Sequence, residues 1–199
     1  MSLSDNDGKI LVRTARDVVT EYLKTGKKNA LQEDFKSRFS YNSGVFVTLN
    51  KANDLRGCIG FPTPEKNLYQ SLVDAAIASA TADPRFAPIK YEELKDISFE
   101  VTVLTPPIEV KVENTLDYPN KIKVGRDGLI VKWEFGSGLL LPQVPIEWGW
   151  NEEEFLNHVC EKAGAPHDCW KRKETKILSF EGIVFKESSP NGNVVRAQL

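Results

Sequence analysis

The chain has 199 residues, of which 41% are hydrophobic and 27% are charged. A chain of this length buries about 70% of the surface of its unfolded state, so its fold requires neither a disulfide nor a metal ion. Its formal net charge of −2 gives no general attraction for nucleic acids or anionic membranes. Basic residues are interleaved with acidic ones, so we also expect no basic stripe and consider nucleic-acid binding disfavoured.

Two further features concern the compartment. No run of about 18 apolar residues marks a membrane-spanning helix, and the first ten residues lack the apolar core of a signal peptide. Three cysteines cannot all pair with one another inside one chain. We therefore expect a cytoplasmic protein with reduced cysteines and no association with a membrane.

Hydrophobic periodicity predicts a long helix first, with one apolar stripe from Ile10 to Leu23. Polar residues 4–7 can cap its start, and Gly26 can end it. Two alternating segments, 44–50 and 55–61, then predict a β-hairpin joined by the four residues KAND.

A second helix is expected after Thr63 and Pro64, with Asn67 as the other candidate cap. Its buried face, between Leu68 and Ala80, consists mainly of small residues, which let a helix approach a sheet closely. Pro84 prevents its continuation. The clearest strand of the chain follows at 97–104, where apolar and polar residues alternate without interruption.

The second half predicts a β-meander, with strands at 121–124, 129–135 and 139–142 and turns at GRDG and GSG. A helix is then expected from Asn151, whose capping box would use Glu154. Cys160 lies on the apolar stripe of that helix and is expected in the core.

A last strand is predicted at 176–185, and residues 187–199 are expected to form a loose tail. Hairpin-linked strands with separate helices indicate an α+β fold, an antiparallel or mixed sheet flanked by helices. A soft boundary near 106–120 would divide the chain into two subdomains.

The segment DLRGCIGFP, residues 54–62, surrounds one thiol with unusually little side-chain bulk. On a strand, Arg56, Cys58 and Gly60 would share one face. An arginine near a thiol favours the reactive thiolate, and a glycine leaves room for a ligand. One hypothesis is therefore a reactive or ligand-contacting Cys58 beside an anion-binding Arg56. The other is a packed cysteine, with the glycines serving a bulge or close helix packing.

Three further residues are candidates for ligand binding. Arg85, in the loop DPRF, can bind a carboxylate or phosphate, unless it only forms a local pair with Asp83. Glu100 points to the non-core face of its strand, where it can pair with Arg56 or act as an acid or base. Gln143 is the polar member of the aromatic segment LPQVPIEWGW.

That aromatic segment also carries Trp148 and Trp150, which can wall a pocket or a partner groove. A hydrophobic staple before the helix at Asn151 would explain Trp150 alone. The chain has two histidines and no zinc-type spacing of cysteines, so we expect no metal site. No phosphate-binding loop or dinucleotide fingerprint appears, and the sequence names no cofactor.

Six motifs occur in order along the chain: LRGCIG, DPRFAPI, ISFEVTVLTPP, VGRDGLIV, GLLLPQVPIEWGW and FLNHVCEKAG. Together they resemble the AMMECR-type domain family over residues 8–186. The resemblance implies one α+β domain whose two subdomains form a cleft. The family has no established biochemical activity, and its prokaryotic genes often neighbour or fuse with those of Memo-like and radical-SAM proteins. Such proteins are therefore the partners that the resemblance implies.

The leading hypothesis is a cleft protein that binds or acts on a small anionic molecule through the face of Arg56 and Cys58. Gly60, Arg85, Glu100 and Gln143 are the further candidate ligand-binding residues. The alternatives are a non-catalytic partner or adaptor of Memo-like and radical-SAM proteins, and a nucleic-acid-associated regulatory protein. The sequence does not separate an enzyme, with Cys58 as its candidate catalytic residue, from a binding protein.

Overall fold

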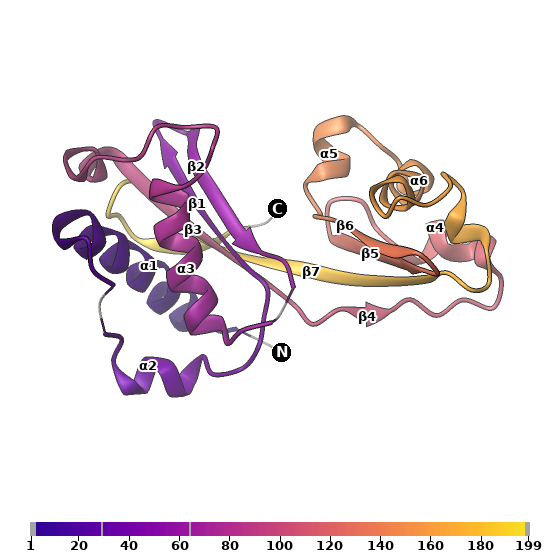
Figure 1. The fold of residues 1–199 in the computed structure, drawn as a ribbon, viewed down its shortest axis with the longest axis horizontal. Coiled ribbons are helices and arrows are strands. Elements are labelled where there is room, and N and C mark those ends of the chain that lie inside the picture. Colours follow the sequence, from indigo (N-terminus) through magenta and orange to yellow (C-terminus); the bar gives the residue numbers. More distant parts are fainter. Residues whose placement is uncertain (1–2, 29, 64, 198–199) are drawn as a thin grey trace. The chain divides into compact units, whose positions relative to one another are not determined.

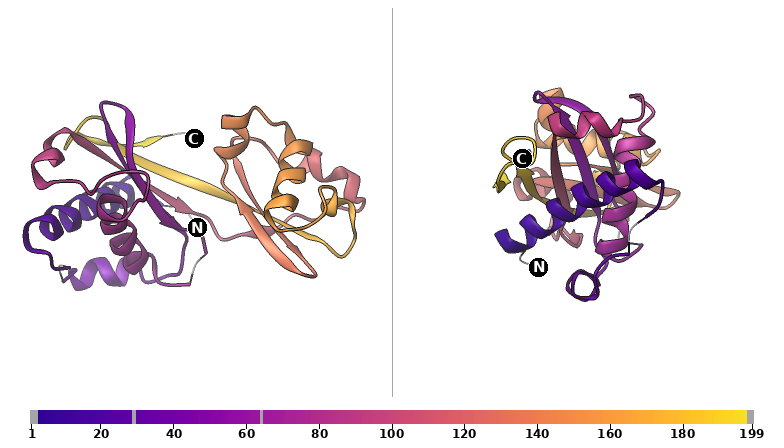
Figure 2. Two further views of the ribbon diagram at one scale, coloured as in Figure 1. Left: turned by 45° about the horizontal axis from the view of Figure 1, so that its top comes forward. Right: turned by 90° about the vertical axis from the view of Figure 1, so that its left-hand side faces the viewer.

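The computed structural model describes residues 3–28, 30–63 and 65–197, which form two units with separate hydrophobic cores (Figures 1 and 2). Of the described residues, unit 1 holds those up to Leu104 and those from Ile183 to Ala197, and unit 2 spans Thr105–Gly182. The chain therefore passes between the units twice. The first passage lies just before the predicted boundary at 106–120, and the sequence patterns did not indicate the second. No helix in the described part of the chain is long and apolar enough to cross a membrane.

Two helices of unit 1 follow the sequence patterns, namely α1 (Asp5–Thr25) and α3 (Leu68–Thr81). The sequence patterns do not predict α2 (Glu33–Arg38) or the short 3₁₀ helix η1 (Tyr91–Asp96). The capping box of Ser4 and Asp7 starts α1, and Gly26 ends it in the left-handed conformation with φ of 71°. Asn67 precedes α3 as its N-cap residue, whereas Pro64 of the other predicted start lies outside the described residues.

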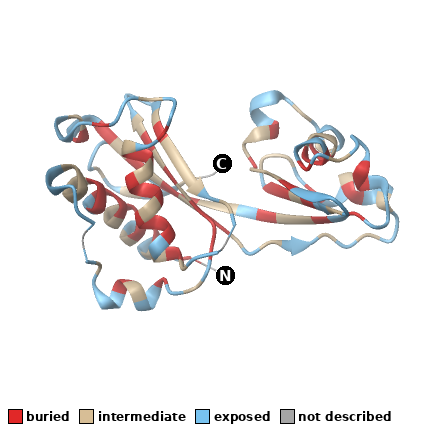
Figure 3. Ribbon diagram, in the orientation of Figure 1, coloured by how far each residue is buried: buried red, intermediate tan, exposed pale blue. Residues whose placement is uncertain are grey.

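The sheet of unit 1 is antiparallel. It contains β1 (Val45–Lys51), β2 (Asp54–Phe61), β3 (Ile97–Leu104), the last part of β7 (Lys176–Glu187), and β8 (Val194–Ala197). The order is β2-β1-β3-β7, and β8 pairs with β7. Alternate apolar side chains of β1 and β3 join α1 and α3 in one core, which Figure 3 shows as the buried part of the unit. The α+β prediction is confirmed.

The hairpin differs from the prediction in two ways. Its turn has two residues instead of four, and both Ala52 and Asn53 have positive φ angles, of 51° and 71°. A β-bulge also shifts the register between Leu49 and Asn50, so that Asn50 pairs with Leu55 and Arg56 has no partner directly opposite.

The C-terminal segment is not a loose tail, because residues 194–197 form β8 and pair with β7. Glu187, the first residue of the predicted tail, is buried and forms ion pairs with Arg13 and Arg16. These arginines lie more than 170 residues earlier in the chain. Local patterns do not show such a distant partner, and a lone glutamate followed by polar residues is typical of a solvated end.

Unit 2 holds a second antiparallel sheet, in which β7 pairs with both β4 (Ile108–Glu109) and β5 (Asp127–Trp133), and β5 pairs with β6 (Gly136–Leu140). Its helices are η2 (Thr115–Asp117), α4 (Tyr118–Lys121), α5 (Val144–Trp148), α6 (Glu152–Lys162) and η3 (Cys169–Lys171). The predicted capping box of Asn151 and Glu154 starts α6. The short α5 was not predicted.

The predicted meander is wrong in detail. Residues 121–124 form no strand, and the turn between β5 and β6 lies at 134–135 instead of at GSG. Asp127 begins β5, and its buried carboxylate accepts the Lys123 N–H at 2.7 Å. A Cβ at Gly138 would lie 2.4 Å from the Ala163 nitrogen, so this strand glycine permits the close approach of the chain at the end of α6.

The expectation of fully reduced cysteines is also wrong, because Cys160 and Cys169 form a disulfide inside the core of unit 2. Cys160 lies in the last turn of α6, and Cys169 begins η3 after the chain has turned at Gly164. The pair is nine residues apart without a CxxC pattern, and three cysteines leave several pairings open. Cys58 is the free thiol.

The disulfide gives a first prediction. Closing a loop of this length stabilises a protein by about 2–3 kcal/mol in the chain-entropy model. We expect the double variant Cys160→Ala, Cys169→Ala to lose about that amount of unfolding free energy in urea. Thiol titration of the unfolded, unreduced wild type should find one free thiol, from Cys58. Three free thiols would contradict the pairing.

Candidate functional site

A row of polar side chains crosses the sheet of unit 1 on the face that points away from α1 and α3. Cys58 on β2 lies opposite Thr48 on β1, and Thr48 lies opposite Glu100 on β3. All three are half-buried. The alternation of each strand sends the neighbouring apolar residues into the core, so these polar ones share the other face.

The guanidinium of Arg56 binds groups other than the Cys58 thiol, which does not support the first of the two hypotheses for this segment. The guanidinium donates to the Ala87 carbonyl at 2.8 Å and to Glu93 Oε1 at 3.3 Å. The β-bulge explains this direction. Arg56 is the extra residue of the bulge, so it breaks the alternation of the strand and its side chain turns away from that of Cys58. The backbone N–H of Lys90, followed by Arg56, lowers the pKa of Glu93, so this arginine holds η1 against the hairpin.

The Cys58 thiol is free and half-buried, and its Sγ lies 3.2 Å from Oγ1 of Thr48. Burial raises the pKa of the Cys58 thiol above its ordinary value, and the hydrogen bond with Thr48 and the charge of Arg85 offset this only in part. The direction is the opposite of the one that a neighbouring arginine predicts. Cys58 is therefore a protonated thiol at neutral pH.

The two glycines of the motif serve packing, which was the alternative hypothesis for this segment. A Cβ at Gly57 would lie 2.1 Å from the carbonyl oxygen of Ser79, so α3 rests directly on β2. A Cβ at Gly60 would lie 2.2 Å from the ring of Phe46, its cross-strand partner. The space expected beside the thiol is therefore filled by an aromatic ring that covers a strand glycine.

Asp83 and Arg85 form the local pair that was the alternative for the DPRF loop, and the pair covers an exposed edge. The buried Asp83 carboxylate accepts the Cys58 N–H at 2.8 Å, and Arg85 donates to the Cys58 carbonyl at 3.2 Å. Because β2 ends the strand order, these backbone groups would otherwise have no partner in the sheet. The Arg85 side chain lowers the pKa of Asp83 strongly.

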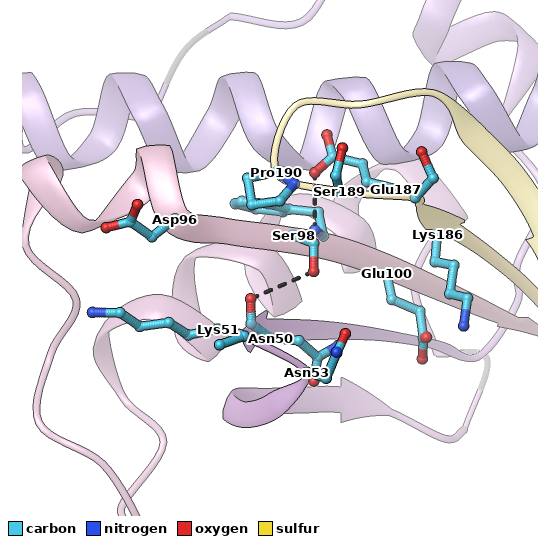
Figure 4. Close-up of a pocket in the computed structure, with 13 residues that line it drawn as sticks. Asn50, Lys51, Asn53, Asp96, Ser98, Glu100, Lys186, Glu187, Ser189 and Pro190 are labelled. Atoms are coloured by element: carbon cyan, nitrogen blue, oxygen red, sulfur yellow. Dashed lines mark hydrogen bonds between the residues drawn. The ribbon is translucent and has the colours of Figure 1, made fainter.

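Beside the polar row lies a pocket of about 650 Å³, which we call the Glu100 pocket (Figure 4). Three segments of unit 1 line it: residues 50–53 at the hairpin turn, Asp96 with residues 98–100 at β3, and residues 186–190 at the end of β7 and just beyond it. Burial raises the pKa of Glu100, and the charge of Lys186 offsets this in part. Within the described residues, the side chain of Glu100 has no hydrogen bond or ion pair, whereas its backbone is part of the ladder between β1 and β3.

Gln143 lies apart from these residues in the fold. It is half-buried at the start of α5, in unit 2, and does not line the Glu100 pocket. The structure thus brings Cys58 and Glu100 into one row, keeps Arg85 and Gly60 beside Cys58 in structural roles, and directs Arg56 to η1.

Sequence reasoning missed two members of the site. Thr48 lies between Cys58 and Glu100, and only the register of the hairpin and of β3 places it there. Lys186 was placed just beyond the last predicted strand, although it belongs to β7. The structure also shows a positive φ angle at Ala52, which lines the pocket. A positive φ in a residue other than glycine marks local backbone strain.

The described residues contain no group of three or more His, Cys, Asp or Glu side chains arranged to hold a metal ion.

Comparison with known proteins identifies the family to which the chain belongs. The AMMECR1 family model matches residues 12–185. The chain belongs to the AMMECR1 family. A protein of Methanothermobacter thermautotrophicus is 51% identical over 185 residues, which cover 93% of this chain and 96% of that protein. Protein PH0010 of Pyrococcus horikoshii is 51% identical over 204 residues, with 99% and 98% covered.

The crystal structure of uncharacterized protein PH0010 is similar to this AMMECR1-family chain with a TM-score of 0.83 and 50% identity, covering 99% of each chain. The likeness confirms the family and the fold expected from the six motifs. The name of that protein states neither an activity nor a ligand.

The protected thiol gives a testable outcome. Alkylation of Cys58 by iodoacetamide in the folded protein should be slow at neutral pH, with an apparent pKa above the free value of about 8.5. The rate against pH is followed by mass spectrometry, and Cys58→Ser is the control that should show no native labelling. Fast single-site labelling at neutral pH would show an exposed thiolate and contradict the structure.

Because Asp83 binds the backbone of the edge strand β2, we expect the variant Asp83→Asn to be less stable than the wild type. The buried carboxylate loses its charge-assisted bonds, so we expect a loss of about 1–3 kcal/mol of unfolding free energy at neutral pH. Because folding lowers the pKa of Asp83, its contribution is complete above about pH 4 and is lost as the pH falls further. The difference between wild type and variant should therefore shrink in acid.

Urea unfolding across the pH range measures this difference, with the exposed Asp96→Asn as the matched control. Two results would rule out the edge-covering role of Asp83. One is a loss of unfolding free energy at neutral pH no larger than that of the control, and the other is a loss that stays the same as the pH is lowered.

Proposed function

We propose that unit 1 binds a small molecule in the Glu100 pocket. Lys186 binds an anionic group of this ligand, and Glu100 forms a hydrogen bond with a polar group of the same ligand. The observation that carries the proposal is Glu100 itself. Its carboxyl group is half-buried on a strand and is left without a protein partner in the described part of the chain.

Partial burial removes some of the water around the Glu100 carboxyl group and disfavours its charged form, and no protein hydrogen bond in the described part of the chain compensates for that loss. A β-branched residue would suit this strand position better. A raised carboxyl pKa next to a pocket is typical of groups that meet a ligand or move a proton. Glu100 therefore fits a role in binding better than a role in holding the sheet together.

Lys186 supplies the positive charge. Figure 4 shows that the side chains of Glu100 and Lys186 extend alongside each other from neighbouring strands. Within the described residues Lys186 forms no ion pair, whereas Lys51 on the other side of the pocket lies 3.6 Å from Glu93. Lys186, instead of Arg56, is thus available to bind an anionic group of the ligand.

The rest of the lining suits a polar ligand. The side chains of Asn50, Asn53, Ser98 and Ser189 offer donors and acceptors, and the volume lies within the usual range for small-molecule sites. Ser98 donates a long bond of 3.4 Å to the Asn50 carbonyl, which a ligand can replace. With Cys58 protonated and bonded to Thr48, any acid–base step in this pocket falls to Glu100.

The test is an NMR titration of the labelled protein with inorganic phosphate, small carboxylates, amino acids and nucleotides. At least one class should shift the amide signals of residues 98–100 and 186–189. Lys186→Met should weaken that binding about tenfold or more, because an ion pair is lost. Lys95→Met, an exposed lysine of the same unit outside the pocket, should leave it unchanged.

Glu100→Gln adds a readout that does not depend on the ligand. Because folding raises the pKa of Glu100, the charged group destabilises the fold as the pH rises through its titration, so the variant should unfold less readily at neutral pH, by on the order of 1 kcal/mol. Binding by none of the probes, or binding that both variants retain in full, would overturn the proposal.

A further inference from the structure

Four aromatic rings of unit 2 lie in a continuous series. The rings of Trp148 and Trp150 are nearly parallel, with centroids 6.1 Å apart, and Trp150 stacks on His158 at 3.8 Å. His158 in turn meets His167 edge to face at 6.2 Å. The series joins α5 to α6 and to the loop before η3.

One carboxylate fixes the far end of this series. Glu161 places its two oxygens 2.8 Å from Nδ1 of His158 and 2.9 Å from Nδ1 of His167. Both histidines of the chain are therefore held in place by the same side chain. The near end, Trp148, stacks on a supported neighbour and is pre-organised for contact with another molecule.

Trp148 is exposed far beyond what packing requires. Its exposure is 71%, and Ile146 on the same short helix is 51% exposed, so that α5 appears mainly as exposed ribbon in Figure 3. The hydrophobic staple accounts for Trp150, which packs against the core of unit 2, but it gives Trp148 no role. Exposed tryptophan on a rigid support is typical of the centre of a binding surface.

The charge around these rings is negative. The segment from α5 to the end of α6 carries one lysine, Lys162, and five glutamates: Glu147, Glu152, Glu153, Glu154 and Glu161. In the described part of the chain only Glu153 has a lysine or arginine within 4 Å, namely Lys171 at 3.4 Å.

Three of these glutamates have local roles: Glu154 completes the capping box, Glu152 accepts the Val124 N–H, and Glu161 binds both histidines. Glu147 has no hydrogen bond or ion pair of its side chain in the described part of the chain, is exposed, and precedes Trp148 in the sequence of α5.

We infer that Ile146, Glu147 and Trp148, backed by Trp150, form a docking surface for an arginine-bearing segment of a partner protein. A guanidinium stacks on a tryptophan face through cation–π attraction, and its N–H groups can bind a neighbouring carboxylate at the same time. The acidic surroundings favour such a cation and repel nucleic acid. This surface lies in unit 2 and is independent of the Glu100 pocket.

The experiment uses the full chain and a fluorescein-labelled peptide of alternating arginine and glycine, followed by fluorescence anisotropy at low salt. The wild type should bind it, and Trp148→Ala and Glu147→Lys should each weaken binding about tenfold or more. Trp148→Phe should retain part of the affinity, because a smaller aromatic face remains. Phe135→Ala, which removes an aromatic side chain of the same unit that is 74% exposed, is the matched control and should bind like the wild type.

Several results would overturn the inference. They are absence of binding at low salt, binding that Trp148→Ala retains, and a loss that Phe135→Ala reproduces. Tighter binding of a single-stranded oligonucleotide than of the peptide would assign the surface to nucleic acid instead. Self-association that Trp148→Ala abolishes would assign it to a second copy of the chain. Circular dichroism of each variant confirms that a loss of binding is not a loss of fold.

Discussion

Unit 1 depends on a single buried carboxylate. Glu187 accepts hydrogen bonds from Arg13 and Arg16 on α1, from the backbone N–H of Phe99 on β3, and from that of Asn191 beyond β7. A buried charge is tolerated only when its bonds are satisfied in this way, and removing one partner would leave the other charges uncompensated. The returning C-terminal segment therefore has one docking position against α1 and β3. That position sets residues 186–190 beside the hairpin turn, which creates the Glu100 pocket.

A second constraint recurs in both units, where a glycine inside a strand allows backbone to approach closely. In unit 1 the backbone of α3 packs directly against Gly57, and in unit 2 the backbone at the end of α6 packs directly against Gly138. In unit 1 the approach is so close that the Ser79 hydroxyl reaches the ladder between β1 and β2, donating to Val47 and accepting from the Ile59 N–H. The glycines beside Cys58 are thus explained by packing. The chemistry of this face depends on which polar groups remain unsatisfied.

By that criterion the two units offer different surfaces. Unit 1 leaves Glu100 and Lys186 unpaired in the described part of the chain, at a polar pocket suited to a small anionic ligand. Unit 2 presents Trp148 and Glu147 on a fixed aromatic support suited to a cationic protein segment. Because the two surfaces share no residues, a variant in one can test its own proposal without disturbing the other. Both belong to a chain of the AMMECR1 family.

The sequence by itself determined the features that depend on residues close along the chain. These include the caps at Ser4 and Asn151, the alternation of β3 and the small-residue face of α3, together with the motifs that indicated the family. Only the tertiary structure decided where Arg56 points, which cysteines pair, and that Lys186 lies beside Glu100. The physical reason is that each of these depends on strand register or on contacts between distant segments. A bulge of one residue redirects a side chain, and a carboxylate is satisfied or left open by groups that local patterns do not show.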